Sequence, residues 1–160
     1  MCKEKVTVYY GDGKGKTTAA LGFAVQAAGR GSSVIIIQFL KGKKEDEIEF
    51  LRRLEPEIKF FSFARFEKNF IELSQEEQEE EAVNIRNGFH FARKVLVTGE
   101  CNLLILDEFL GLLDNHIISG EDFESLVNAG SEDTEIIFTG RSMRDSLRKY
   151  VGKVYEIHED

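Results

Sequence analysis

The order of apolar and polar residues along the chain predicts strands that alternate with helices. Short apolar runs are typical of strands buried on both faces of a sheet, and they fall at residues 5–10, 34–38, 58–63, 103–106, 135–138 and 153–157. The segments between them are predicted to contain helices at residues 16–28, 45–54, 74–98, 119–129 and 142–151. Because such an alternation pairs strands in parallel through right-handed crossovers, the predicted fold class is α/β with a mainly parallel central sheet.

The longest predicted helix begins with a capping signal and an acidic stretch. Ser74 and Glu77 match a capping box. Residues 75–81 carry five glutamates, which the helix dipole favours at this end, and we expect them on a solvent-exposed face. The predicted buried stripe consists of Ala82, Ile85, Phe89, Ala92 and Leu96.

A glycine-rich loop joins the first predicted strand to the first predicted helix, and it reads Gly11-Asp12-Gly13-Lys14-Gly15-Lys16-Thr17-Thr18. Such a loop cradles phosphates with its backbone N–H groups, and the helix that follows adds its positive dipole end. Lys16 is expected to reach phosphate oxygens and the Thr17 hydroxyl to ligate Mg²⁺. The match to the P-loop pattern is imperfect, because Tyr10 stands where the first glycine belongs. The alternative is an ordinary flexible turn.

Two adjacent acids, Asp107 and Glu108, directly follow four aliphatic residues of a predicted strand. This places them at the carboxyl edge of the sheet beside the glycine-rich loop, where one acid would hold Mg²⁺ directly or through water. The residues alone therefore predict a single domain, residues 1–160, with a three-layer P-loop NTPase-like fold that binds Mg²⁺ and a nucleoside triphosphate. They do not say which bond breaks.

Two basic residues and an aromatic stretch follow other predicted strands. Lys41 lies in a basic loop and Arg141 directly after the strand at 135–138, so both are candidate phosphate contacts; for Lys41 a solvated loop is an equal alternative. Residues 60–70 hold five of the thirteen phenylalanines. Some of them belong to the core, and the others are candidates for a flat apolar ligand or a subunit contact.

Composition narrows the class of protein. With 160 residues, 42% of them hydrophobic, the chain fits one globular domain, and a net charge of −8 without a basic stripe disfavours nucleic-acid binding. We expect no membrane span and no signal peptide. The two cysteines and three histidines form no metal-binding pattern, so a cytoplasmic protein with reduced thiols is expected.

The chain resembles the P-loop type of ATP:corrinoid adenosyltransferases over residues 6–156. The resemblance rests on four segments in the same order: Gly11–Ala20, Gln38–Gly42, Leu106–Glu108 and Thr139–Arg141. The family has the same spacing in its glycine loop, which accounts for Tyr10.

The resemblance implies an enzyme that transfers the 5′-deoxyadenosyl group of MgATP to a Co(I) corrinoid, cobalamin or cob(I)yrinic acid a,c-diamide, and releases tripolyphosphate. It implies that Lys16, Thr17 and the loop amides hold the triphosphate and that Glu108 helps to hold Mg²⁺, with Asp107 either a ligand or a supporting group. A homodimer in the cytoplasm and a flavoprotein reductant are implied partners.

The chain departs from the family pattern at three places. Its first predicted strand begins at residue 5, so we do not expect the N-terminal extension with which the family covers the partner subunit's site. Gln26 stands where the family has an arginine. In the family a Phe-Thr-Trp segment packs near the corrin; Phe66 matches its Phe and Lys68 stands in place of its Trp, and these two residues are the expected corrinoid contacts. Two other classes stay open: a P-loop phosphotransferase or NTPase acting on a small substrate, and a non-catalytic ATP- or corrinoid-binding protein.

Overall fold

A computed structural model describes residues 3–12, 15–42 and 44–159 of the chain. Its centre is a six-stranded sheet with the strand order β3-β2-β4-β5-β1-β6, in which every pairing is parallel. The strands are β1 (Val6–Tyr10), β2 (Val34–Gln38), β3 (Ile58–Ser62), β4 (Leu103–Asp107), β5 (Glu135–Gly140) and β6 (Lys153–Glu156). The α/β fold class and the parallel sheet are confirmed.

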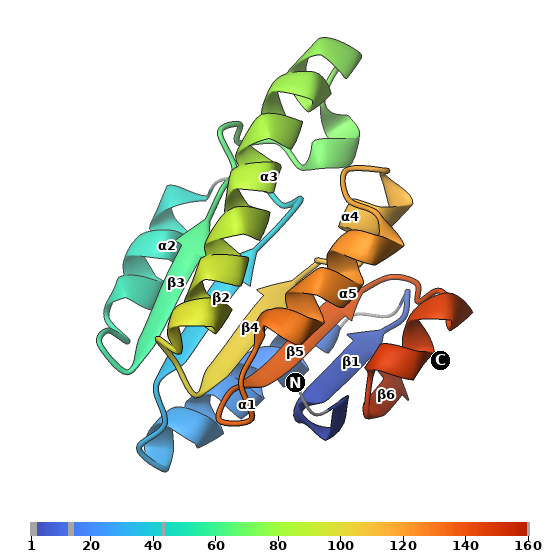
Figure 1. The fold of residues 1–160 in the computed structure, drawn as a ribbon. Coiled ribbons are helices and arrows are strands. Elements are labelled where there is room, and N and C mark those ends of the chain that lie inside the picture. The colour runs from blue at the N-terminus through green and yellow to red at the C-terminus, as the bar shows by residue number, and fades with distance from the viewer. Residues whose placement is uncertain (1–2, 13–14, 43, 160) are drawn as a thin grey trace.

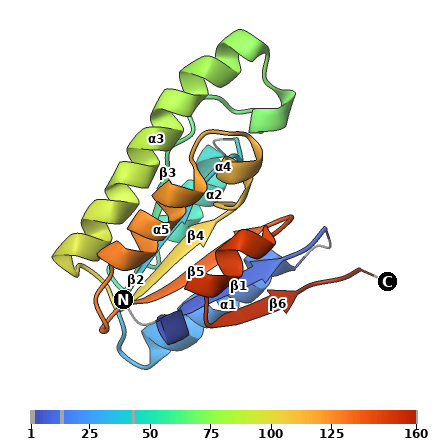
Figure 2. The same ribbon diagram turned by 45° about the vertical axis from the view of Figure 1, so that its right-hand side comes forward.

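Helices cover both faces of the sheet, which gives three layers (Figures 1 and 2). The α-helices are α1 (Lys16–Gly29), α2 (Glu45–Arg52), α3 (Gln75–Thr98), α4 (Gly111–Asp114) and α5 (Gly120–Ala129). Short 3₁₀ helices, η1 (Lys3–Lys5), η2 (Phe70–Glu72) and η3 (Asp145–Tyr150), complete the elements. Among the residues that the structure describes, no helix is long and apolar enough to cross a bilayer.

The two faces of the sheet have different packing. Helix α1 lies on one face, where Ala20, Ala24 and Ala27 are buried and let the helix axis come close to the strands. Helices α3 and α5 cover the other face and enclose the larger core, which includes Phe89, Phe109 and other large side chains. The small residues of α1 therefore let it pack closely against β4 and β5, and Thr17 in its first turn contacts Asp107 at the carboxyl end of β4.

Three details of the sequence prediction are wrong. The helix predicted at 142–151 is the 3₁₀ helix η3, which begins at Asp145, because the Ser142 hydroxyl donates to Asp114 at 3.0 Å instead of capping a helix. Helix α4 was not predicted. In α3 the glutamates are not all solvated: Glu81 is buried and takes the first position of the buried stripe, while Ala82 is only half-buried.

Candidate active site

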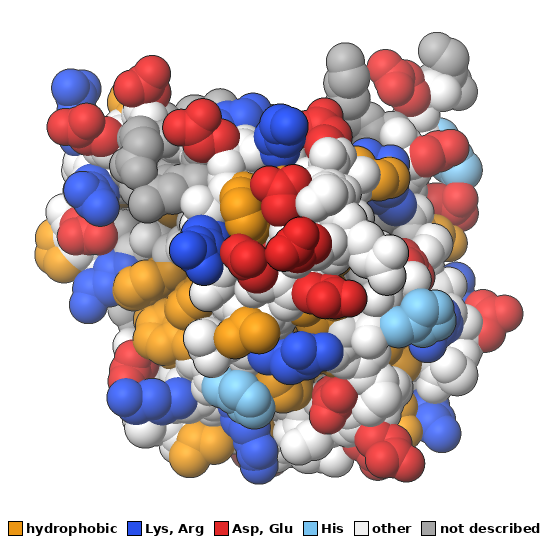
Figure 3. All heavy atoms as spheres, turned by 90° about the horizontal axis from the view of Figure 1, so that it is seen from above, with side chains coloured by type: hydrophobic (Ala, Val, Ile, Leu, Met, Phe, Trp, Pro, Cys, Tyr) orange, Lys and Arg blue, Asp and Glu red, His pale blue; other side chains and the backbone are white. Residues whose placement is uncertain are grey.

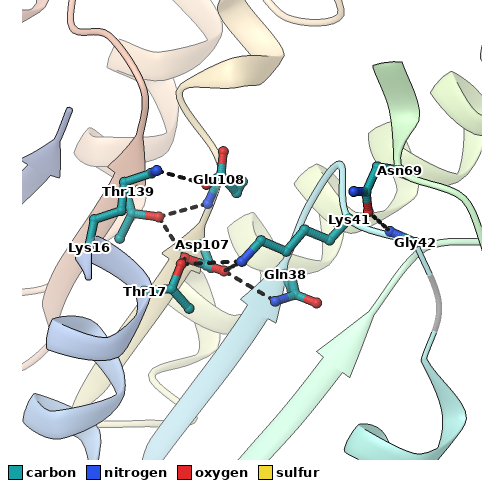
Figure 4. A network of polar contacts seen from close by, with 9 residues as sticks. All are labelled: Lys16, Thr17, Gln38, Lys41, Gly42, Asn69, Asp107, Glu108 and Thr139. Atoms are coloured by element: carbon teal, nitrogen blue, oxygen red, sulfur yellow. Dashed lines mark hydrogen bonds and ion pairs between the residues drawn. The ribbon is translucent and has the colours of Figure 1, made fainter. Parts of the chain in front are cut away.

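The glycine loop and the acidic pair meet at the carboxyl edge of the sheet, as Figure 4 shows. Thr17, in the first turn of α1, donates its hydroxyl proton to Asp107 Oδ1 at 2.9 Å. Lys16 Nζ lies 3.5 Å from Glu108 Oε1, and both side chains are almost fully enclosed. Residues 90 positions apart along the chain are thus brought into direct contact.

Backbone conformation explains why glycines flank the loop. Gly11 has a φ of 145°, donates its N–H to Gly140 O at 3.1 Å, and has no room for a Cβ, which would collide with the carbonyl oxygen of Ile157. Gly15 caps α1 with a φ of 114°, which other residues rarely adopt. Asp12 and Thr18 are exposed, and Gly13 and Lys14 lie outside the described residues.

Asp107 is the hub of the polar network and is only 2% exposed. Its Oδ1 accepts from the hydroxyls of Thr17 and, at 2.7 Å, Thr139. Its Oδ2 accepts from the Gln38 amide at 3.2 Å and lies 3.5 Å from Lys41 Nζ. Since a carboxylate offers about four acceptor positions, protein donors fill the ones Asp107 has. These contacts hold the Thr17 hydroxyl and the Lys41 ammonium against the Asp107 carboxylate.

Glu108 is held differently from its neighbour. Its φ of 59° lies in the left-handed region, a conformation that costs a residue with a Cβ roughly 1–2 kcal/mol. Its backbone N–H donates to Thr139 Oγ1 at 2.8 Å, which stabilises this turn. Among the described residues, the Glu108 carboxylate has an ion pair with Lys16 only, so it keeps acceptor positions for a further cation.

The donor set fits a magnesium ion that phosphate oxygens complete. No three His, Cys, Asp or Glu residues cluster as a metal site within the described ranges, but magnesium at a nucleotide usually takes one or two carboxylates plus phosphate and water. Because Thr17 gives its proton to Asp107 and accepts from Lys41, one of its two oxygen lone pairs stays available to a cation. The Lys41 ammonium lies 3.3 Å from that oxygen, so positive charge is already accommodated there.

Two cavities flank the Lys41 side chain. The larger, about 680 Å³, lies beside Thr17 and Asp107 and has mostly apolar walls, among them Leu21, Phe50 and Phe60. The smaller, about 270 Å³, is lined by Glu108, Arg141 and Ile71 among others. Lys41 and Asn69 line both. Figure 3, which looks at the molecule from above, shows acidic, basic and apolar side chains mixed over this end.

The expected corrinoid contacts, Phe66 and Lys68, lie in the loop between β3 and η2. Phe66 is half-buried and packs against the larger core, so only part of its side chain is exposed to solvent. Lys68 is exposed. Neither residue lines the two cavities described above. Gln26 is exposed on α1.

Sequence reasoning missed several residues that the structure brings to the site. In the sequence, Gln38 and Thr139 stand out only as parts of the family resemblance, yet both donate to Asp107. Asn69 accepts from the Gly42 N–H at 2.9 Å and lies between the cavities. Ile71 is 80% exposed at the smaller cavity, and no sequence signal separates it from its buried neighbour Phe70.

Comparisons with known proteins agree on one family. The family model described as ATP:corrinoid adenosyltransferase BtuR/CobO/CobP matches residues 3–160. The corrinoid adenosyltransferase of Escherichia coli K12 is 27% identical over 153 residues, which cover 95% of this chain and 75% of that protein. The corrinoid adenosyltransferase CobA of Salmonella typhimurium is 29% identical with the same coverage.

Two further matches are informative in a narrower way. An uncharacterised protein of Nostoc sp. PCC 7120 is 34% identical over 146 residues, which cover 85% of this chain but only 38% of that protein. A KaiC-like protein of Pyrococcus horikoshii OT3, at 17% identity, has a TM-score of 0.63 and matches 97% of this chain and 73% of its own. The latter likeness shows the fold alone.

Proposed function

The chain belongs to the ATP:corrinoid adenosyltransferase family of alkyl-group transferases, and we propose that it transfers the 5′-deoxyadenosyl group of MgATP to a Co(I) corrinoid. The electron pair of Co(I) attacks C5′, a cobalt–carbon bond forms, and the C5′–O bond breaks. The electron pair of that bond leaves with tripolyphosphate. Since Co(I) is itself the nucleophile, the protein has no proton to remove and needs only to orient C5′ and stabilise the leaving charge.

The observation that carries this proposal is the pairing of Lys16 with Glu108 and of Thr17 with Asp107, the second of which lines a mostly apolar cavity. Lys16 and the loop amides would bind the phosphate chain, and Lys41 and Arg141 would add charge from the two sides. Thr17 and Glu108 would hold Mg²⁺, with Asp107 orienting Thr17. Bound magnesium would neutralise charge on the phosphate oxygens as the C5′–O bond breaks.

The corrinoid is proposed to lie against the segment between β3 and α3. Phe66 and Lys68 stay our proposed contacts from the family resemblance. Ile71 joins them because it is an exposed apolar side chain that borders the same cavity as Glu108 and Arg141. We also propose a homodimer in the cytoplasm, supplied with reduced corrinoid by a flavoprotein.

Phosphorus NMR of the reaction mixture tests the proposed bond cleavage. With MgATP and a chemically reduced corrinoid, we expect tripolyphosphate to appear in step with a light-sensitive cobalt–carbon absorbance. With MgATP alone, hydrolysis should be slow or absent. ADP and orthophosphate formed without any corrinoid would overturn the proposal and favour a phosphotransferase or NTPase. ATP binding with no turnover would favour a carrier.

A further inference from the structure

Glu81 is a buried carboxylate that the proposed chemistry does not use. It lies two turns into α3 and is only 3% exposed. It belongs to the acidic stretch at residues 75–81, for which the sequence predicts a solvent-exposed face. A buried carboxylate is costly unless its oxygens are satisfied by donors. Glu81 Oε1 accepts from Arg65 N at 2.9 Å and from the Asn84 amide at 3.1 Å. Its Oε2 accepts from Arg65 N and Phe66 N, both at 3.1 Å.

Glu81 therefore holds the main chain of the loop at 63–69. The donors at Arg65 and Phe66 are backbone N–H groups, so the contact fixes the path of the loop itself and not the position of one side chain. Hydrogen bonds to an ionised acceptor are the stronger kind.

The same loop supports the end of β2. The chain at Gly42 packs so closely against Glu67 that a Cβ there would collide with the Glu67 carbonyl oxygen. The Gly42 N–H donates to Asn69 Oδ1 at 2.9 Å. The Phe70 N–H donates to Leu40 O at 2.8 Å. Leu40 has a φ of 66°, so this turn depends on outside contacts to keep its shape.

Lys41 sits within the supported segment. Its side chain crosses between the two cavities, and its ammonium lies 3.5 Å from Asp107 Oδ2 and 3.3 Å from Thr17 Oγ1 (Figure 4). We propose that Glu81 is a positioning residue for the nucleotide site: it holds the loop at 63–69 against Leu40–Gly42 and thereby places Lys41. This inference rests on the nucleotide-binding part of the proposed function and not on corrinoid transfer.

The test uses Glu81→Gln with Glu80→Gln as its matched control. The neighbouring Glu80 pairs with Arg65 Nη1 at 3.5 Å on the exposed surface, so its loss removes a charge beside the same loop without freeing the backbone amides. In Glu81→Gln an NH₂ group faces backbone donors. We expect its Kd for MgATP, measured by calorimetry without corrinoid, to rise about tenfold, the scale of one charge-assisted hydrogen bond. Glu80→Gln should stay within about twofold of the parent.

A double-mutant cycle separates positioning from general destabilisation. If Glu81 acts through Lys41, adding Glu81→Gln to a Lys41→Met protein should weaken MgATP binding less than about twofold further, because coupled residues are not additive. Hydrogen exchange of the ligand-free protein should also speed up at residues 39–42 in Glu81→Gln and not in Glu80→Gln. If Glu81→Gln does not fold, Glu81→Asp, which keeps the charge but is shorter, is measured in the same way.

Three results would overturn the inference: unchanged exchange at 39–42, an unchanged Kd for MgATP, or fully additive effects in the cycle. A parent protein that binds MgATP but releases no tripolyphosphate would refute the proposed transfer reaction while leaving the test of Glu81 intact. If the parent does not bind MgATP at all, the inference falls together with the nucleotide site.

Discussion

Replacing Glu108 with glutamine tests the metal assignment most sharply, because the change removes one charge and keeps the side chain's length. At 3.5 Å, the attraction between Lys16 Nζ and Glu108 is about 5 kcal/mol at an effective dielectric constant of about 20, before desolvation is subtracted. The catalytic cost is set by the loss of one preorganised group, about 2.7–4 kcal/mol, which corresponds to a decrease of about 10²–10³-fold in turnover.

The assay measures the adenosylation rate as a function of magnesium concentration. We expect Glu108→Gln to need much more magnesium for half-maximal rate. Its melting temperature should also fall, because the nearly enclosed Lys16 ammonium loses its charged partner. Asp114→Asn is the control, because Asp114 borders the same cavity and accepts from Ser142 instead of pairing with Lys16. It should leave the magnesium dependence unchanged. A Glu108→Gln protein with full activity and the parent's magnesium dependence would refute the assignment.

Three further outcomes are expected. Thr17→Val should raise the magnesium requirement and lower turnover by at least about tenfold. Thr17→Ser, which keeps the hydroxyl, should keep most of the parent's turnover; equal rates for the two variants would exclude the hydroxyl from the metal site. Phe66→Ala should raise the KM for the corrinoid and cost less folding free energy in urea than Phe109→Ala, a fully buried truncation worth about 3–5 kcal/mol; an equal cost would make Phe66 structural. Burial, and then the neighbouring Glu100, raise the pKa of Cys101 to about 11 from 9.0. Because the unfolded thiol ionises first, folding stability should fall as pH rises from 9 to 11, and Cys101→Ala should flatten that slope in urea titrations; an unchanged slope would contradict it.

The features that could be predicted from the sequence are those fixed by local order along the chain. A strand, a glycine-rich loop and a helix in succession are enough to place Lys16 and Thr17 at the start of α1. Four aliphatic residues ending in two acids are enough to place Asp107 and Glu108 at a strand's carboxyl end. The alternation of elements predicts a parallel sheet without giving the order of its strands.

What could not be predicted depends on which strands become neighbours. Thr139 reaches Asp107 because β5 lies next to β4, and Gln38 does so because β2 lies on the other side. Glu81 looks like its solvated neighbours in the sequence, and its burial depends on donors from the Asn84 side chain and from the backbone amides of the loop at 63–69. The exposed Ile71 is likewise distinguished from a core residue only by the cavity that it borders.

The central claim is that the C5′–O bond of ATP breaks, and the position of that oxygen after turnover tests it directly. ATP labelled with ¹⁸O at the oxygen between C5′ and the α-phosphorus is incubated with magnesium, reduced corrinoid and the protein, and the products are analysed by mass spectrometry. The account predicts that all of the label leaves in tripolyphosphate and that the adenosyl group on cobalt carries none. Label retained on a nucleoside or nucleotide product would mean that a P–O bond was broken, and it would contradict adenosyl transfer.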